Sequence, residues 1–234
     1  MTYPITSLHS LTVRDFLFYI GNPHMKISFS QFGEDVLLHH FIFNELKLEK
    51  GFYVDVGCFH PIQYSNTNFL YMSGWKGLNI DAEQNNIDLF NQFRPKDVNI
   101  CCGIGDDEKV LKFYKFELAA CSTFSKSVAE KWQRENNWKL QEIKKLPVRP
   151  LNIILDDFLP KEQSIDYMNI DVEGYDEFAI NSLLTSKYKP NIISIEIHDL
   201  DCIKPFENKI VRKIDQWGYR LKAICYLSCI FIKK

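Results

Sequence analysis

The chain has 234 residues, a formal net charge of −2 at pH 7 and a hydrophobic fraction of 46%, which are ordinary values for a globular protein. This composition excludes a disordered chain, a collagen-like repeat and a coiled coil, and the near-neutral charge provides no basic field that would attract nucleic acid or anionic lipid. A chain of this length buries a large core without disulfides or a structural metal. We therefore expect a single domain over 28–234, preceded by an N-terminal extension over 1–27.

Strand and helix patterns alternate along the chain. Short apolar runs predict five core strands: 52–56, 78–81, 98–104, 166–171 and 191–198. Apolar residues at helical spacing predict a helix over Glu34–Leu48, which Gly51 ends, and further helices after the second, fourth and fifth strands. Alternating strands and helices predict a mostly parallel sheet with helices on both faces.

Two parts of the chain depart from this alternation. Residues 110–116 alternate like an edge or hairpin strand, and 126–146 are charged and partly helical until Pro147 and Pro150 end that stretch. At the end of the chain, 219–225 and 229–232 predict two strands that are too close together for a parallel crossover. The last strand must therefore run antiparallel to its neighbour, an ending that nicotinamide-binding Rossmann domains usually lack.

Acidic residues cluster where ligands bind in such a fold, at the carboxyl ends of the strands. Four of the five core strands carry a carboxylate at or near that end, and the third runs into Asp106-Asp107. Such a rim suits hydroxyls, amino groups, a cationic sulfonium or a metal better than a bare phosphate. Gly57 follows the first strand, but the other glycines of G-x-G-x-x-G are absent, which disfavours NAD or FAD. Gly57 could equally serve only a tight strand-to-helix turn.

Asp81 adds a second cofactor signal. It lies 24 residues after Gly57 (81 − 57), close to the spacing at which an acidic side chain accepts hydrogen bonds from ribose hydroxyls. The pair predicts an adenosine-type ligand without a pyrophosphate, which points to S-adenosylmethionine.

The chain contains five further motifs in this order: S-Q-F-G-E-D (30–35), G-F-Y-V-D-V-G-C-F-H-P (51–61), S-N-T (65–67), G-W-K-G-L-N-I-D-A (74–82) and I-D-V-E-G-Y-D-E (170–177). Together they resemble the FkbM family of S-adenosylmethionine-dependent methyltransferases. The similarity extends over about 28–232. It implies a class I methyltransferase fold with a seven-stranded sheet, and a methyl acceptor that in this family is commonly a hydroxyl of a sugar, polysaccharide, glycolipid or polyketide.

The resemblance also implies cofactor-binding residues. Asp55 and Gly57 match the motif around the methionine moiety, and Ser65, Asn66 and Thr67 would hold its carboxylate or amine. Ser65 or Asn66 could instead only cap the following helix.

Three further side chains are implied less directly. Asp81 stands where the family often has glutamate, so it would bind the ribose, with Glu83 as a second residue that could share this task. Asp106 would accept from the adenine amine unless it belongs to a solvated turn, and Gln31 would close the site from the N-terminal side.

Methyl transfer to a hydroxyl needs an aligned acceptor and a base or metal that removes its proton. Asp171 and Glu173 follow the fourth strand, and Glu196 and His198 end the fifth, so we expect the four side chains to meet. His198 or Asp171 is the expected base, with Glu173 beside them, and a neutral imidazole suits this task because its unperturbed pKa is about 6.5. Asp171, Glu196 and His198 could alternatively bind Mg²⁺, and His198 could be merely exposed at a strand end.

The sequence thus predicts an O-methyltransferase that acts on a sugar hydroxyl in glycan, polysaccharide or nucleotide-sugar biosynthesis, with 112–146 as a lid over the acceptor. N-methylation, transfer to a non-sugar hydroxyl, or a silent S-adenosylmethionine-binding module are the alternatives.

The seven cysteines are odd in number and contain no C-x-x-C pair, which favours reduced thiols in a reducing compartment. The chain has no apolar run of about 18 residues and no signal-peptide pattern at its start, so we expect a cytoplasmic protein.

Overall fold

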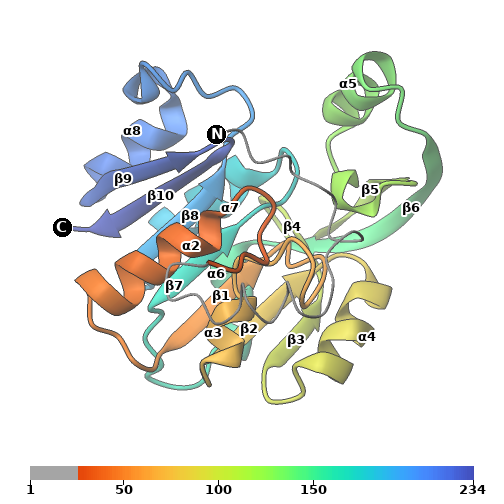
Figure 1. Cartoon of the computed structure of the whole chain (residues 1–234). Helices are drawn as coiled ribbons and strands as arrows, with labels where there is room; N and C mark the ends of the chain where they lie inside the picture. Colours follow the sequence, from red (N-terminus) through yellow and green to blue (C-terminus); the bar gives the residue numbers. More distant parts are fainter. Residues whose placement is uncertain (1–25) are drawn as a thin grey trace, which may run out of the picture.

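The computed structural model describes residues 26–234, so the expected extension over 1–27 lies almost entirely outside the described residues. A seven-stranded sheet with the order β3-β2-β1-β7-β8-β10-β9 forms the centre (Figure 1). Its strands are β1 (Phe52–Val56), β2 (Lys76–Asp81), β3 (Val98–Cys101), β7 (Tyr167–Ile170), β8 (Ile192–Glu196), β9 (Tyr219–Cys225) and β10 (Ser228–Lys233). All five predicted core strands are therefore present.

The C-terminal hairpin confirms the predicted reversal. Only Tyr226 and Leu227 join β9 to β10, a link too short for a crossover, so β10 runs antiparallel to β9. β10 inserts between β9 and β8 and is antiparallel to both. The other adjacent pairs in this sheet are parallel, so the carboxyl ends of β1, β2, β3, β7 and β8 lie along one edge.

Helices cover both faces of the sheet, as predicted. They are α2 (Glu34–His39), the π-helical continuation η2 (His40–Glu45), α3 (Asn68–Met72), α4 (Gln84–Phe93), α6 (Leu151–Phe158), α7 (Asp176–Leu184) and α8 (Lys209–Gln216), with a short 3₁₀ turn η4 (Pro205–Glu207). Apolar side chains of α6, α7 and α8 pack in the larger core, whereas those of α2, η2 and α3 pack in a second one. The helix predicted over Glu34–Leu48 ends earlier, at Glu45.

A three-stranded arm extends from the edge beyond β3 (Figure 1, green). It comprises β4 (Gly103–Ile104), β5 (Lys109–Phe116), η3 (Ala119–Cys121), α5 (Lys126–Glu135) and β6 (Leu140–Arg149), with the strand order β4-β6-β5. The predicted strand over 98–104 is therefore two strands, β3 and β4, which belong to different sheets.

The arm also corrects the interpretation of 126–146 as a charged, partly helical stretch. Its second part is the strand β6, and Pro147 lies inside that strand instead of ending it. β4 pairs only with Val148 and Arg149, so at Pro147 the strand has one paired side, where a sheet tolerates proline. Within β6, Glu142, Lys144 and Lys145 interrupt the period-2 pattern of apolar residues by which a strand is recognised, so the strand is not apparent from its sequence. α6, which directly follows Pro150, is absent from the predicted elements.

Among residues 26–234, no helix combines the length and hydrophobicity needed to cross a bilayer.

Candidate functional site

Gly57 brings two strand ends into direct contact. Its backbone adopts φ +80, and its N–H donates to the carbonyl of Ile80 at 2.8 Å, which ties the end of β1 to β2. A Cβ at this position would overlap the carbonyl oxygen of Asp171, the residue that follows β7. Only glycine allows both the positive φ and this close approach.

A first cavity lies between the end of β2, the β3–β4 junction and the arm. Its walls include Asp81, Cys102, Ile104, Phe113, Phe124 and Tyr175. The rings of Phe113 and Phe124 pack with centroids 4.8 Å apart, and Phe124 packs against Tyr175 at 5.8 Å. The aromatic side of this cavity, with the carboxylate of Asp81 at the end of β2, is chemically suited to a flat heterocycle attached to a polyol.

The carboxylate of Asp81 organises the turns on both sides of the first cavity. It accepts from the backbone N–H of Phe59 at 2.9 Å and of Glu83 at 2.8 Å, and from the side-chain amide of Asn86 at 3.1 Å. A carboxylate offers about four acceptor positions, so about one remains for a ligand. Burial raises the pKa of Asp81 to about 6, against the opposing effect of these hydrogen bonds.

Glu83 and Asp106 differ in how they relate to this cavity. The buried carboxylate of Glu83 pairs with Lys115 of β5 at 2.5 Å and Lys144 of β6 at 3.5 Å, so it fastens the arm to the sheet. Asp106 is exposed, pairs with Lys109, and is not among the residues that line the cavity. This position agrees with the alternative of a solvated turn, and the contact of Asp106 with adenine stays a prediction.

A second cavity shares Gly57, Asp171 and Glu173 with the first. Its other walls include Gln31, Asp55, Ser65, Asn66, Asn169 and Glu196. Gln31 belongs to the 28–33 loop, which Asp35 of α2 holds by accepting from Ser28, Ser30 and the N–H of Phe29. The S-Q-x-G-E-D motif thus positions the loop that borders this cavity.

Two members of the S-N-T motif bind neighbouring protein groups, and the third keeps a free oxygen. Ser65 accepts from the N–H of Asn68 at the start of α3, and Thr67 is fully buried and donates to Asp55 at 2.6 Å. Asn66 donates to Asn169 at 3.0 Å, while its own carbonyl oxygen has no hydrogen-bond partner among residues 26–234. Asn66 is therefore the member of the motif with free capacity toward a ligand.

Arg94 connects the S-N-T motif to the turn at Pro61. The guanidinium is 1% exposed and donates to Thr67 at 2.8 Å, to Ser65 at 2.9 Å and to the carbonyl of Pro61. Nothing in the sequence signals this role, because Arg94 ends α4 among ordinary polar residues. The side chain of Asn169 donates to Asp55 at 3.0 Å, a role that the sequence analysis also missed. An amide inside the largely apolar strand β7 was the signal that could have indicated it.

The four acid and histidine side chains expected to meet do so at the ends of β7 and β8. The Nε2 atom of His198 lies 3.0 Å from a carboxylate oxygen of Glu196 and 3.4 Å from one of Glu173. Asp176 accepts from the N–H groups of Val172 and Gly174, which holds the turn on which Glu173 stands at φ 47.

The ionisable side chains of this cluster shift one another's pKa values. Burial and the neighbouring charge of Glu196 raise the pKa of Glu173 to about 7, and burial with both glutamates raises that of Asp171 well above its usual value. Burial alone lowers the pKa of His198, but the two carboxylates outweigh it and raise the pKa to about 10. The two carboxylates therefore shift the pKa of His198 upward, away from the unperturbed value on which its expected role as a neutral base rested.

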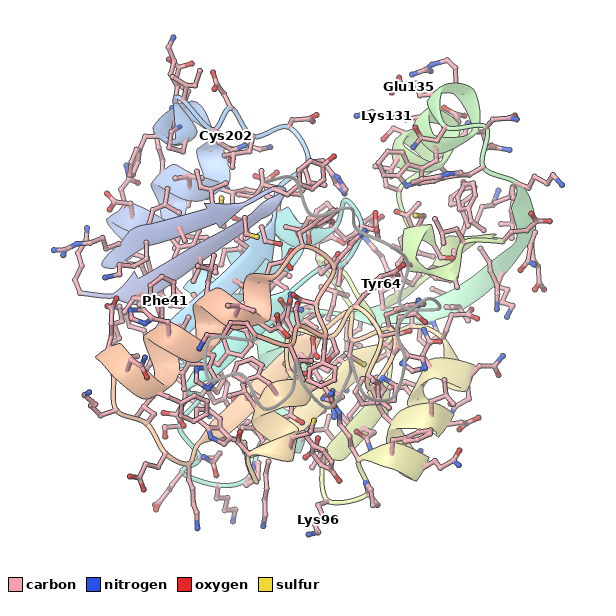
Figure 2. All side chains as sticks on the ribbon, in the orientation of Figure 1. Phe41, Tyr64, Lys96, Lys131, Glu135 and Cys202 are labelled. Atoms are coloured by element: carbon pink, nitrogen blue, oxygen red, sulfur yellow. The ribbon has the colours of Figure 1, made fainter. Side chains whose placement is uncertain are left out.

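A third cavity of about 410 Å³ opens on the other side of the cluster. Glu196 lines both the second and the third cavity, and His198 lines the third. The arm forms the opposite wall with Ser127, Lys131 and Trp132, whose ring meets that of His198 edge-on at 5.4 Å. Lys131 projects from α5 in Figure 2, and its Nζ lies 3.8 Å from the carboxylate of Asp199.

The model of the Methyltransferase FkbM domain matches residues 55–221, well over half of the chain. Curated protein sequences give no significant match. Among solved structures, a TehB-like SAM-dependent methyltransferase from Corynebacterium glutamicum is 12% identical, with a TM-score of 0.42 over 94% of this chain and 96% of the other. Monomeric WbdD is 10% identical, with a TM-score of 0.45 over 95% of this chain and 45% of the other. The family assignment rests on the domain model.

Proposed function

The chain belongs to the FkbM methyltransferase family and is an S-adenosylmethionine-dependent methyltransferase, and from this premise we propose that it methylates a sugar hydroxyl. The single observation that carries the proposal is the position of the cluster of Asp171, Glu173, Glu196 and His198. Through Glu196 it borders both the second cavity and the larger third cavity.

The first two cavities fit the cofactor. The apolar walls and the carboxylate of Asp81 suit adenine and ribose, and the two cavities share Gly57, Asp171 and Glu173, so one ligand would extend from the first into the second. There the unpartnered oxygen of Asn66 would accept from the methionine amine, and the carboxylates of Asp171 and Glu173 would stabilise the sulfonium. Asp55 would act indirectly, by holding Thr67 and Asn169.

The third cavity suits a hydroxyl-rich acceptor. Ser127, Asn208, Asp199 and Lys131 supply hydrogen-bonding groups, and Trp132 adds an aromatic ring. The buried indole Nε1 of Trp132 has no hydrogen-bond partner in the described part of the chain, so an acceptor oxygen would satisfy it. Because the arm supplies this wall, we include the expected lid over 112–146 in the proposal, as part of one domain over 28–234.

Bound S-adenosylmethionine supplies an electrophilic methyl group that transfers in line to the acceptor oxygen. We assign the proton of that hydroxyl to Asp171, because it borders both cofactor cavities and belongs to the cluster that reaches the third cavity through Glu196. Burial and the neighbouring carboxylates raise the pKa of Asp171, and a positive charge nearby, such as the sulfonium or a divalent cation like Mg²⁺, would oppose this shift. A neutral amine acceptor would not need such a base, which favours O- over N-methylation.

The proposed setting is polysaccharide, glycan or nucleotide-sugar biosynthesis in the cytoplasm. All seven cysteines are free thiols, and Cys58, Cys102, Cys121 and Cys229 are buried, which supports a reducing compartment.

The test begins with calorimetric titration of the full chain with S-adenosylhomocysteine and with NAD as control. Glycosides, nucleotide sugars, amino sugars and polyketide alcohols are then incubated with S-adenosylmethionine, and methylated products are identified by mass and NMR. We expect binding of S-adenosylhomocysteine alone and an O-methyl sugar that Asp171→Asn loses while Glu45→Gln retains it. A methylated amine or non-sugar alcohol, or cofactor binding without transfer to any acceptor, would overturn the proposal.

A further inference from the structure

Three potential metal ligands converge at the boundary between the second and third cavities. A carboxylate oxygen from Glu173, one from Glu196 and a ring nitrogen of His198 all lie within 4.8 Å of one another. The three side chains come from two adjacent parallel strands, Glu173 from the turn after β7 and the other two from the end of β8. The three atoms therefore surround a common point at which an ion could be coordinated.

These atoms lack ordinary partners. Glu173 Oε2, Glu196 Oε2 and His198 Nε2 are all buried and make no hydrogen bond of acceptable geometry within residues 26–234, although both oxygens lie within ion-pair distance of the ring nitrogen. Their side chains are only 16%, 12% and 21% exposed. Among the described residues, neither glutamate pairs with a lysine or arginine. Buried polar atoms of this kind are rare unless a water or an ion satisfies them.

The site is also held in place from outside. Thr123 of the arm donates its hydroxyl to the carbonyl of Glu173 at 2.6 Å, and Asp176 holds the same turn. The edge of the His198 ring rests against Trp132. Metal centres generally need such supporting contacts to orient their ligands.

Acidic side chains gather at this point. Asp171, Glu173 and Glu196 all line the second cavity, and the imidazole of His198 lies beside them. A divalent cation would be attracted to this group of carboxyl side chains.

We propose that Glu173, Glu196 and His198 bind a divalent transition-metal ion, of which Mn²⁺ and Zn²⁺ are the fitting examples. The imidazole separates this donor set from the all-oxygen sites that Mg²⁺ and Ca²⁺ prefer. Glu173 thus takes the ligand position that the sequence analysis assigned to Asp171, and Asp171 stays free as the base.

The role of the ion rests on the proposed function. With three protein ligands, the ion would keep open coordination positions, and the acceptor hydroxyl would bind at one of them. The cation would lower the pKa of that hydroxyl. Asp171 takes the hydroxyl proton, the acceptor oxygen forms a bond to the methyl carbon, and the carbon–sulfur bond breaks with its electron pair left on sulfur. The metal keeps its oxidation state, and no oxidant or reductant is needed.

The test uses the full chain stripped with EDTA and then titrated with MnCl₂, since Mn²⁺ binds thiols weakly and therefore avoids the exposed Cys101 and Cys202. Calorimetry should show one Mn²⁺ per chain, bound more tightly than Mg²⁺. Electron spin-echo spectroscopy should show ¹⁴N coupling from one imidazole.

Glu173→Gln and Glu196→Gln should each weaken Mn²⁺ binding by at least about 10- to 100-fold, the range for lost supporting residues of metal sites. His198→Gln should remove the ¹⁴N coupling. The exposed pair of His40 and Glu45, 3.7 Å apart, supplies the matched control, and Glu45→Gln should bind Mn²⁺ as the wild type does. Circular dichroism identifies any variant that fails to fold, and the remaining variants then decide the outcome.

Absence of Mn²⁺ binding at millimolar concentration, or binding that the folded variants leave unchanged, would overturn the metal site. Titration with S-adenosylhomocysteine in EDTA separates this result from the proposed function, because Asp81 and Asn66, which are proposed to hold the cofactor, are not among the three metal ligands.

Discussion

Replacing Gly57 with alanine should push apart the ends of β1 and β7. Alanine at φ +80 costs about 1–2 kcal/mol of folding free energy, because its Cβ crowds the following carbonyl. The overlap of this Cβ with the carbonyl oxygen of Asp171 adds about 1–3 kcal/mol of overpacking. The expected loss is therefore about 2–5 kcal/mol, the sum of these two costs.

Gly74 offers a control in which the overlap is absent. It has φ +85, but a Cβ there meets nothing within 4 Å, so Gly74→Ala should cost only the backbone strain of about 1–2 kcal/mol. The difference between the two variants isolates the contact between the cofactor turn and the cluster on β7.

Urea unfolding followed by tryptophan fluorescence measures the stability, and calorimetric titration measures the affinity for S-adenosylhomocysteine. Gly57→Ala should weaken this affinity, and in the folded fraction it should lower turnover by about 100-fold, the usual effect of a misplacement of about 1 Å. Equal stabilities of the two alanine variants, with wild-type cofactor affinity in Gly57→Ala, would refute the reasoning.

The remaining predictions concern single side chains. Asp81→Ala should weaken S-adenosylhomocysteine binding by about 1–3 kcal/mol in a calorimetric titration, and unchanged affinity would remove Asp81 from the site. Asp81 has a pKa of about 6 in the native protein and of 3.8 in the unfolded chain. The unfolded chain therefore loses this proton first as pH rises, so the contribution of Asp81 to the free energy of unfolding should fall across this range. Urea unfolding between pH 4 and 7 should therefore show a smaller decline in Asp81→Ala than in the wild type; parallel curves would contradict this pKa. Thr67→Val should cost about 1–3 kcal/mol in urea unfolding, since Asp55 loses its donor, and a wild-type midpoint would argue against the network. His198→Asn should lower kcat while leaving cofactor affinity unchanged, whereas Trp132→Leu should mainly raise the KM of the acceptor; steady-state kinetics distinguishes the two, and wild-type constants would exclude either residue.

The sequence was sufficient for the sheet and for its acidic edge. Apolar runs identify β1, β2, β7 and β8, because buried parallel strands are apolar on both faces. The ends of parallel strands meet at one edge, so Asp171 and Glu196 could be expected to lie together without any coordinates. The short link at Tyr226 likewise required the final reversal.

Other features depended on partners that lie far apart in the chain. Glu83 faces lysines on the arm, and Asp106 points to solvent, yet both follow strands in the same way. Arg94 gains its role from Ser65 and Thr67, about thirty positions earlier, which no local pattern records.

The pKa of His198 shows most clearly which properties follow from the local sequence and which from the tertiary structure. The sequence by itself determined that an imidazole would stand among carboxylates at the end of β8. Only the tertiary structure decided which carboxylates come within ion-pair distance and how deeply the ring is buried, and these two quantities set its pKa. Burial and long-range Coulomb interactions depend on three-dimensional distance, whereas strand periods and strand ends depend on neighbours along the chain.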